Sequence, residues 1–199
     1  MWLSDVSMQH WVFGGQPRWA DSYWVHTRVM RLFGELDGGS VRSATGILYR
    51  VEPGLGKGRV LVQSTVAPTD DTVRRIDLAA ALGGLQTGDR VGIRVKANAA
   101  KTVNHTTDGV TRKHRVARPP DELEAWFAEI SDRALCDVRV EGLETGTERQ
   151  HKVPIAVATI DLTAVVTDPP ALLELVAAGV GKARAFGCGL VSVRLVGHG

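Results

Sequence analysis

The chain has 199 residues, of which 44% are hydrophobic and 23% charged, and its formal net charge is +2. These values are typical of a soluble globular protein with room for one medium domain or two small ones of roughly 100 residues each. No segment approaches the ~20 consecutive apolar residues of a membrane helix. Met1–Asp5 does not begin a signal peptide, so we expect a cytoplasmic protein without membrane contact.

The two cysteines, Cys136 and Cys188, form no CxxC pair and no Cys/His cluster. We therefore expect no bound metal and no cofactor. In a reducing cytosol both thiols are expected to be free and buried, and a disulfide between them is the alternative.

The first half of the chain predicts an alternation of strands and helices. The expected elements are a strand in 1–12, a helix in 19–33, strands at 47–51 and 59–64, a short helix in 72–82 and a strand at 90–96. The first helix is indicated by Val25, Val29 and Leu32, whose spacing places them on one face. The order β-α-β-β-α-β is that of a ferredoxin-like unit.

The second half predicts the same order of elements. We expect an extended basic segment at 96–116 with a turn at Asp108-Gly109, a helix after Pro119, strands at 138–140 and 153–166, a helix at 170–178 and a strand at 190–196. The predicted fold class is therefore α+β, with two tandem ferredoxin-like (RRM-like) domains at residues 1–96 and 97–199.

Basic residues are concentrated in three segments, whereas acidic residues cluster elsewhere. The three groups are Lys96, Lys101, Arg112, Lys113, Arg115 and Arg118; Arg149, His151 and Lys152; and Lys182 and Arg184. Such clustering on a protein of nearly balanced charge indicates a polyanion ligand. A solvated surface without a partner is the alternative.

Tyr23 and His26 are three residues apart on the first predicted helix. Their side chains are therefore roughly 60° apart around the helix axis and can face one ligand. Histidine suits proton transfer near neutral pH, and tyrosine can assist it. From spacing alone, the alternative is that both residues merely border the core.

A glycine-rich segment, Gly179–Leu190, precedes the last predicted strand. Glycines let backbone N–H groups approach an anion closely, and Lys182 and Arg184 would add charge. No Gly-Lys-Ser/Thr closes a Walker A spacing. For Gly179 a helix C-cap is the favoured interpretation, whereas packing and ligand contact both stay open for Gly181, Gly187 and Gly189.

This segment, GVGKARAFGCGL, resembles the glycine-rich signature of CRISPR-associated RNA-processing proteins. Its Gly-Cys-Gly-Leu form resembles the CasE branch, the endoribonuclease subunit of the type I-E Cascade complex. Four other stretches agree with that branch in the right order: Met1–Ser4, Leu48–Glu52, Val60–Ser64, and Val95–Asn98 with Lys101-Thr102. Ala99, where relatives often carry proline, and segment 37–46 depart from the family pattern.

The resemblance implies a metal-independent endoribonuclease that recognises the stem-loop of CRISPR repeat RNA. It implies cleavage by 2′-hydroxyl attack, with His26 as catalytic base or acid and Tyr23 assisting, and product ends carrying a 2′,3′-cyclic phosphate and a 5′-hydroxyl. It further implies that the enzyme stays bound to the mature guide RNA beside other Cascade subunits. The residues that we expect to bind RNA are Lys96, Lys101, Arg112, Lys113, Arg115, Arg149, Lys152, Gly181, Lys182, Arg184, Gly187 and Gly189.

Two other functions are compatible with the sequence. A non-catalytic RNA-binding subunit of the same fold would bind RNA and cleave nothing. A metabolic ferredoxin-like enzyme acting on a small anion would show no preference for stem-loops. The separated basic groups argue against the metabolic enzyme, because a small ligand needs only one site.

Overall fold

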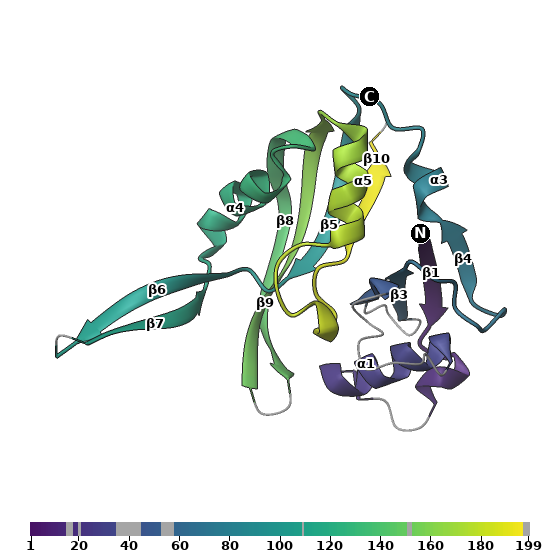
Figure 1. Cartoon of the computed structure of the whole chain (residues 1–199), viewed down its shortest axis with the longest axis horizontal. Helices are drawn as coiled ribbons and strands as arrows, with labels where there is room; N and C mark the ends of the chain where they lie inside the picture. Colours follow the sequence, from purple (N-terminus) through teal and green to yellow (C-terminus); the bar gives the residue numbers. More distant parts are fainter. Residues whose placement is uncertain are drawn as a thin grey trace.

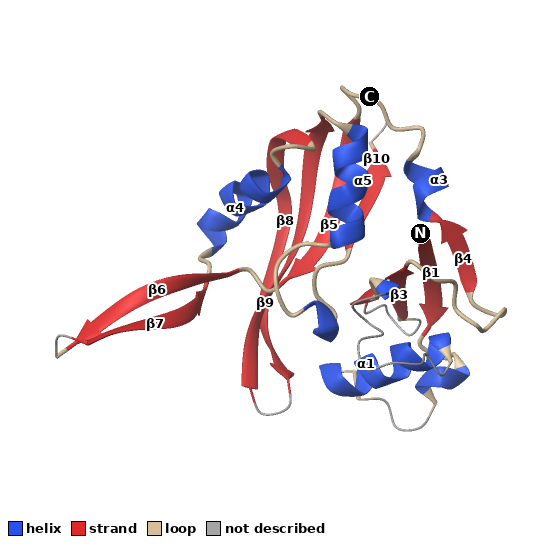
Figure 2. Cartoon of the chain, viewed as in Figure 1, coloured by secondary structure: helices blue, strands red, loops and turns tan. Residues whose placement is uncertain are grey.

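The computed structural model describes residues 1–14, 18–19, 21–34, 45–52, 58–108, 110–150 and 153–196. These residues form two four-stranded antiparallel sheets and a two-stranded arm that projects from the second sheet (Figures 1 and 2). In both sheets the second, third, first and fourth strands of the unit lie in that order from edge to edge. The chain therefore has the predicted α+β fold, with two tandem ferredoxin-like units.

The first sheet has the order β2-β3-β1-β4. Its strands are β1 (Trp2–Ser7), β2 (Leu48–Glu52), β3 (Arg59–Ser64) and β4 (Arg74–Asp77). Before β2 the described residues include the helical segments η1 (Trp11–Phe13), α1 (Ser22–Met30) and η2 (Arg31–Phe33). Helix α1 packs Val25 and Val29 into the first core, as the spacing predicts. It begins at Ser22 because the Asp21 carboxylate accepts hydrogen bonds from two backbone N–H groups of its first turn.

The helix predicted for 72–82 is only half correct, because residues 74–77 form the edge strand β4 and only α3 (Leu78–Leu82) is helical. Asp77 starts the helix there by accepting hydrogen bonds from the N–H groups of Ala79 and Ala80. Strand β4 is short and mostly exposed, so it lacks the apolar alternation of a half-buried strand. Residues 65–73, all of them described, contain no helix.

The second sheet has the order β10-β5-β9-β8. Its strands are β5 (Arg90–Ala97), β8 (Leu135–Gln150), β9 (Val153–Val166) and β10 (Val191–Leu195). Helices α4 (Leu123–Ser131) and α5 (Pro169–Ala178) provide the two crossovers. Leu123 and Phe127 of α4 and Leu172 and Val176 of α5 are buried in the second core.

Strand β5 corrects one assignment made from the sequence. Residues 90–96, predicted as the last strand of the first unit, pair with β9 and β10 and are the first strand of the second unit. Val91, Ile93 and Val95 are buried in the second core. The alternation of a strand shows that one face is buried, but not in which sheet it pairs. The break between the two sheets therefore precedes Arg90, and residue 96 lies near the end of β5.

The arm consists of β6 (Ala100–Thr107) and β7 (Val110–Ala117), inserted between β5 and α4. Every residue of β7 is exposed. Residues paired across an antiparallel ribbon share a face. His105 pairs with Arg112, whereas Asn104 pairs with Lys113, so Arg112 and Lys113 lie on opposite faces of the arm. A 3-10 turn, η3 (Pro120–Glu122), leads from the arm into α4.

Arg50 of β2 joins the two units. Its side chain is 2% exposed. Its guanidinium donates hydrogen bonds to Arg94 O (2.8 Å), Leu190 O (3.0 Å), Ser192 Oγ (2.8 Å) and Glu52 Oε1 (2.7 Å). Burial lowers the pKa of Arg50, and the neighbouring Glu52 carboxylate opposes that effect. A buried, fully engaged guanidinium thus fixes the first sheet against β5 and β10.

Candidate active site

His26 lies on α1, where that helix meets the glycine-rich segment of the second unit. The short helix η4 (Arg184–Phe186) of this segment lies beside α1 (Figure 1). The His26 ring is half-buried, with its centroid 6.4 Å from the ring of Tyr49 and 6.4 Å from that of Phe186. The structure therefore brings together two features that the sequence indicated separately, the histidine helix and the glycine-rich segment.

Tyr23 lies one turn before His26 on the same helix. Its side chain is 50% exposed, at the surface of α1. Its backbone N–H is one of the two that donate to the Asp21 cap (3.1 Å). The assisting role suggested for the Tyr23 phenol stays a prediction.

Tyr49 is a site residue that the sequence reasoning missed. Its side chain is 1% exposed. Its hydroxyl lies 3.0 Å from Ser22 O, at the start of α1, and 3.2 Å from Ala185 O, in η4. Tyr49 therefore links the His26 helix to the glycine-rich segment. The sequence places Tyr49 in a predicted strand and in the family-like stretch Leu48–Glu52, and neither signal reveals a contact 136 residues further along the chain.

The glycines of the segment have a clear packing role. Gly179 caps α5 with φ 65°, and its N–H donates to Leu175 O, which confirms the C-cap interpretation. Gly187 has φ 79°, and a Cβ there would lie 3.1 Å from Tyr49 Cε2. Gly189 has φ 92°, and a Cβ there would lie 2.9 Å from Val180 O. Only glycine fits these two positions without strain, and contact of Gly181, Gly187 and Gly189 with RNA stays a prediction.

A pocket of about 210 Å³ is lined by Tyr49 and Phe186, whose rings lie beside that of His26, but not by His26 itself. Its lining residues are Trp19, Ser22, Val25, Tyr49, Val51, Lys96, Glu148, Phe186 and Gly187. Lys96, at the end of β5, forms an ion pair there with Glu148 of β8. The Lys96 side chain is 13% exposed. Of the basic residues predicted to bind RNA, Lys96 is thus placed beside the histidine helix.

The other predicted basic residues are spread over several surfaces. Lys101 forms an ion pair with Glu122 at the base of the arm, and its ammonium group lowers the pKa of that carboxyl. Arg112 shares one face of the arm with His105 and His114, whose rings are 6.0 Å apart. Lys113 and Arg115 lie on the opposite face of the arm. Lys182 and Arg184 are exposed just before and at the start of η4, and Arg149 is near the end of β8. Lys152 and His151 lie outside the described residues.

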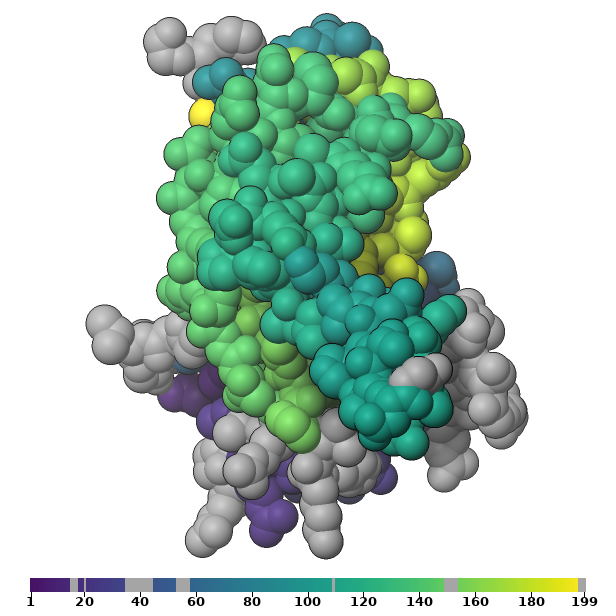
Figure 3. Space-filling view, turned by 90° about the vertical axis from the view of Figure 1, so that its left-hand side faces the viewer, coloured from purple at the N-terminus to yellow at the C-terminus, as the bar shows by residue number. Residues whose placement is uncertain are grey.

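The arm and the long β8–β9 ribbon both extend beyond the body of the second sheet (Figure 1). Figure 3 views the molecule from the side on which the arm projects, with the arm in dark teal. The arm carries Arg112, Lys113 and Arg115, whereas β8 carries Arg149 together with the acidic residues Glu144 and Glu148. Contact of these ribbons with RNA stays a prediction.

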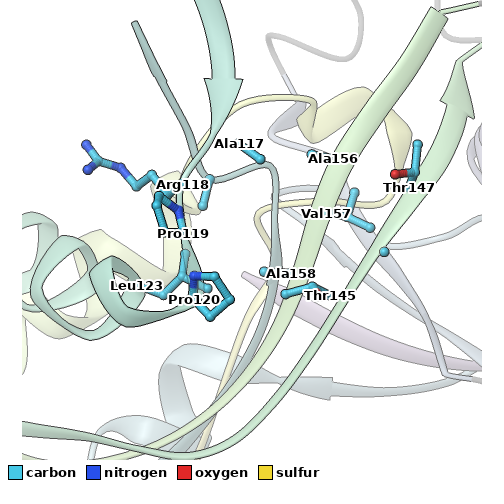
Figure 4. Close-up of a pocket in the computed structure, with 12 residues that line it drawn as sticks. Ala117, Arg118, Pro119, Pro120, Leu123, Thr145, Thr147, Ala156, Val157 and Ala158 are labelled. Atoms are coloured by element: carbon cyan, nitrogen blue, oxygen red, sulfur yellow. The ribbon is translucent and has the colours of Figure 1, made fainter. Parts of the chain in front are cut away.

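A larger pocket of about 420 Å³ lies at the base of the arm (Figure 4). Figure 4 shows residues 117–120 and Leu123 on one side and residues of β8 and β9, such as Thr145 and Val157, on the other. Its described lining residues include Arg118 but no histidine, carboxylate or cysteine. This pocket therefore lacks the groups for acid–base chemistry.

The two cysteines are free. Cys188 is buried beside Lys96, and burial raises its pKa to about 12, so its thiol is protonated at neutral pH. Cys136 is exposed, so the expectation that both thiols are buried is wrong for Cys136. Among the described residues, no group of three or more His, Cys, Asp or Glu side chains is arranged to hold a metal ion. No helix in the described part of the chain has the length and apolarity to cross a membrane.

Comparison with known proteins agrees with this architecture. The model of the family described as CRISPR associated protein matches residues 1–194, and the chain belongs to that family. The chain is similar to the crystal structure of the CRISPR-associated protein Cas6e from Escherichia coli K-12, with 25% identity, TM-score 0.69, and coverage of 97% of this chain and 98% of that one.

Two further solved structures share the fold over nearly their whole length. One is the CRISPR endoribonuclease Cse3 bound to a 19 nt RNA (23% identity, TM-score 0.70, coverage 97% and 98%). The other is a chain of a CRISPR RNA-guided surveillance complex (20% identity, TM-score 0.65, coverage 98% and 100%). No curated protein matches the sequence.

Proposed function

We propose that this protein is a metal-independent endoribonuclease that processes precursor CRISPR RNA. The observation that carries the proposal is the placement of His26, half-buried against Tyr49 and Phe186 where α1 meets the glycine-rich segment. Family membership supports it, as does the shared fold with a protein described as a CRISPR endoribonuclease.

The proposed reaction is a transesterification at phosphorus. The 2′-hydroxyl oxygen attacks the adjacent phosphorus while its proton passes to a base, the bond from phosphorus to the 5′-oxygen breaks, and that oxygen takes up a proton. The products carry a 2′,3′-cyclic phosphate and a 5′-hydroxyl. His26 acts as the base or the acid because imidazole changes protonation near neutral pH. Tyr23 assists the other proton transfer, and cationic side chains stabilise the charge on the phosphorus oxygens.

The RNA substrate in this proposal is the stem-loop of the CRISPR repeat. Proteins recognise double-stranded RNA mainly through its shape, its phosphates and its 2′-hydroxyl groups. The arm and the basic residues at 149–152 are the surfaces that we propose to contact the stem. Replacing Arg149 and Lys152 with alanine is expected to weaken binding and to flatten its salt dependence. Unchanged affinity would remove residues 149–152 from the binding surface.

The product is proposed to stay bound. The mature guide RNA then joins the protein to the other subunits of a Cascade surveillance complex, as the shared fold with a chain of such a complex supports. Retention makes the reaction nearly single-turnover, so binding and cleavage are best measured with protein in excess over RNA.

The proposal is tested by incubating purified protein with a labelled CRISPR repeat hairpin RNA in excess EDTA. The control is the same RNA with a single 2′-deoxy sugar at the cleavage site. We expect one cut in the native RNA, with a cyclic phosphate on the upstream product, and none in the deoxy RNA. RNA that is bound but never cut would favour a non-catalytic RNA-binding subunit. RNA that is not bound at all would overturn the proposed ligand.

A further inference from the structure

We propose that Lys96 is a further catalytic residue, the cation that stabilises the cleaved phosphate, and that Glu148 only neutralises it in the free protein and takes no part in the reaction. This inference rests on the proposed ribonuclease function. Lys96 and Glu148 form an ion pair in the pocket that is also lined by Tyr49 and Phe186, the two ring neighbours of His26.

The backbone fixes Lys96 relative to His26. The N–H of Gly189 donates to Lys96 O (2.7 Å), which ties the end of β5 to the glycine-rich segment. Three residues earlier in that segment, Phe186 lies against the His26 ring. Tyr49 lines the same pocket, and the centroid of its ring is 6.4 Å from that of His26. Lys96 and His26 therefore share Tyr49 and Phe186 as neighbours.

The surroundings of Lys96 favour a strong interaction with a phosphate. Its side chain is 13% exposed and that of Glu148 is 34% exposed, so the carboxylate is the more open partner. Apolar walls such as Val25 and Val51 lower the local dielectric, which strengthens charge interactions in the pocket. Burial raises the pKa of the neighbouring Cys188 thiol to about 12, so it is protonated and carries no charge.

Glu148 is the group that a phosphate would replace. It is the residue directly before the basic stretch at 149–152 that we propose to bind the stem. RNA bound there brings negative charge close to the Glu148 carboxylate. Like-charge repulsion then weakens the Glu148–Lys96 pair, and the ammonium group is transferred to a non-bridging oxygen of the phosphate. No proton moves in this step, because the lysine acts as a fixed positive charge throughout.

If the Lys96–Glu148 pair is structural, replacing either residue should affect the cleavage rate alike. If Lys96 is a catalytic cation, only its own replacement should lower the rate. Under our inference, Lys96→Met lowers the single-turnover cleavage rate at saturating protein about 100-fold, the effect of losing one charge-stabilising group. Glu148→Gln keeps the rate within about threefold. If the pair only holds the fold together, both variants break it and lose activity to a similar extent.

The experiment measures single-turnover cleavage of the repeat hairpin RNA, its Kd and the melting temperature for each variant. The matched control is Glu174→Gln, which removes the carboxylate of an exposed ion pair with Arg133 far from the pocket. Lys96→Arg keeps the charge and is expected to retain most of the rate even if Lys96→Met folds poorly. The inference would be overturned if Lys96→Met and Glu148→Gln lose cleavage rate equally, or if Lys96→Met cleaves at the wild-type rate. In either case, cleavage by the wild type would leave the proposed function intact. Absence of cleavage by the wild type would overturn both.

Discussion

Replacing Arg50 with methionine tests whether the two units are held together by the buried guanidinium. Methionine keeps an apolar chain of similar length but removes every donor. The change leaves two backbone carbonyls, Arg94 O and Leu190 O, and the Ser192 hydroxyl without the partner that they have in the native protein. Glu52 keeps a second cation nearby, since its carboxylate lies 3.5 Å from Arg94 Nε.

The magnitude follows from these partners. An acceptor that is buried and left unsatisfied costs about 1–3 kcal/mol. Breaking a buried charged pair by removing one member costs about 3–5 kcal/mol in total. We therefore expect the free energy of unfolding to fall by about 3–5 kcal/mol. For a chain of this size, that loss lowers the melting temperature by about 6–20 °C.

The assay is thermal and urea unfolding of wild type, Arg50→Met and Arg59→Met. Arg59 is the control, because its ion pair with Asp5 is solvent-exposed and the Arg59 side chain is 58% exposed. Its replacement is expected to change stability by less than about 1 kcal/mol. An Arg50→Met protein that unfolds within 1 kcal/mol of the control would refute the role given to the buried guanidinium.

Three further predictions concern single residues. In the native protein iodoacetamide is expected to label Cys136 and to spare Cys188, because a pKa of about 12 leaves only about one Cys188 thiol in 10⁴ ionised at pH 8. Mass spectrometry before and after unfolding measures the labelling, and equal labelling of both native thiols would contradict the prediction. Gly189→Ala is expected to lower the free energy of unfolding by about 1–3 kcal/mol, since the φ of 92° and the close Val180 carbonyl strain any side chain there. Urea unfolding measures this change, and an unchanged free energy would contradict the prediction. Asp21→Ala removes the N-cap of the His26 helix and is expected to lower the free energy of unfolding by about 0.5–2 kcal/mol and to slow cleavage. Unfolding followed by circular dichroism and the hairpin cleavage assay test this, and unchanged stability together with an unchanged cleavage rate would contradict it.

The local pattern of the sequence predicts much of the fold. The spacing of Val25, Val29 and Leu32 places α1, and those side chains are buried as expected. The alternation around Val60 and Val62 places β3 in the first core. Asp108, at the predicted turn of the arm, has φ 52°, a conformation that suits a turn. These features depend on neighbours in the chain, which is why a periodic pattern reveals them.

Long-range contacts account for what the sequence did not reveal. The burial pattern of β5 is the same whichever sheet it joins, so residues 90–96 were assigned to the wrong unit. The edge strand β4 has almost no buried face and so gives no pattern.

The same distinction between local pattern and long-range contact applies to the candidate site. His26 was found because histidine on a helix is a recognisable chemical signal and because the chain resembles a known family. Tyr49, Phe186 and Glu148 were missed, since their roles arise from contacts with residues far away in the sequence. The His26 ring lies beside Tyr49 of the first core, as the alternative interpretation expects, and its catalytic role stays a prediction.

The measurement that tests the central claim most directly compares wild type with His26→Ala on the repeat hairpin RNA. Cleavage is followed with protein in excess and EDTA present, and Kd is measured on the uncleavable 2′-deoxy RNA. We predict that the alanine variant binds with a Kd within a few-fold of wild type and cleaves at least about 100-fold more slowly, as expected for loss of general acid–base catalysis. Cleavage at the wild-type rate by His26→Ala would contradict the account of the active site.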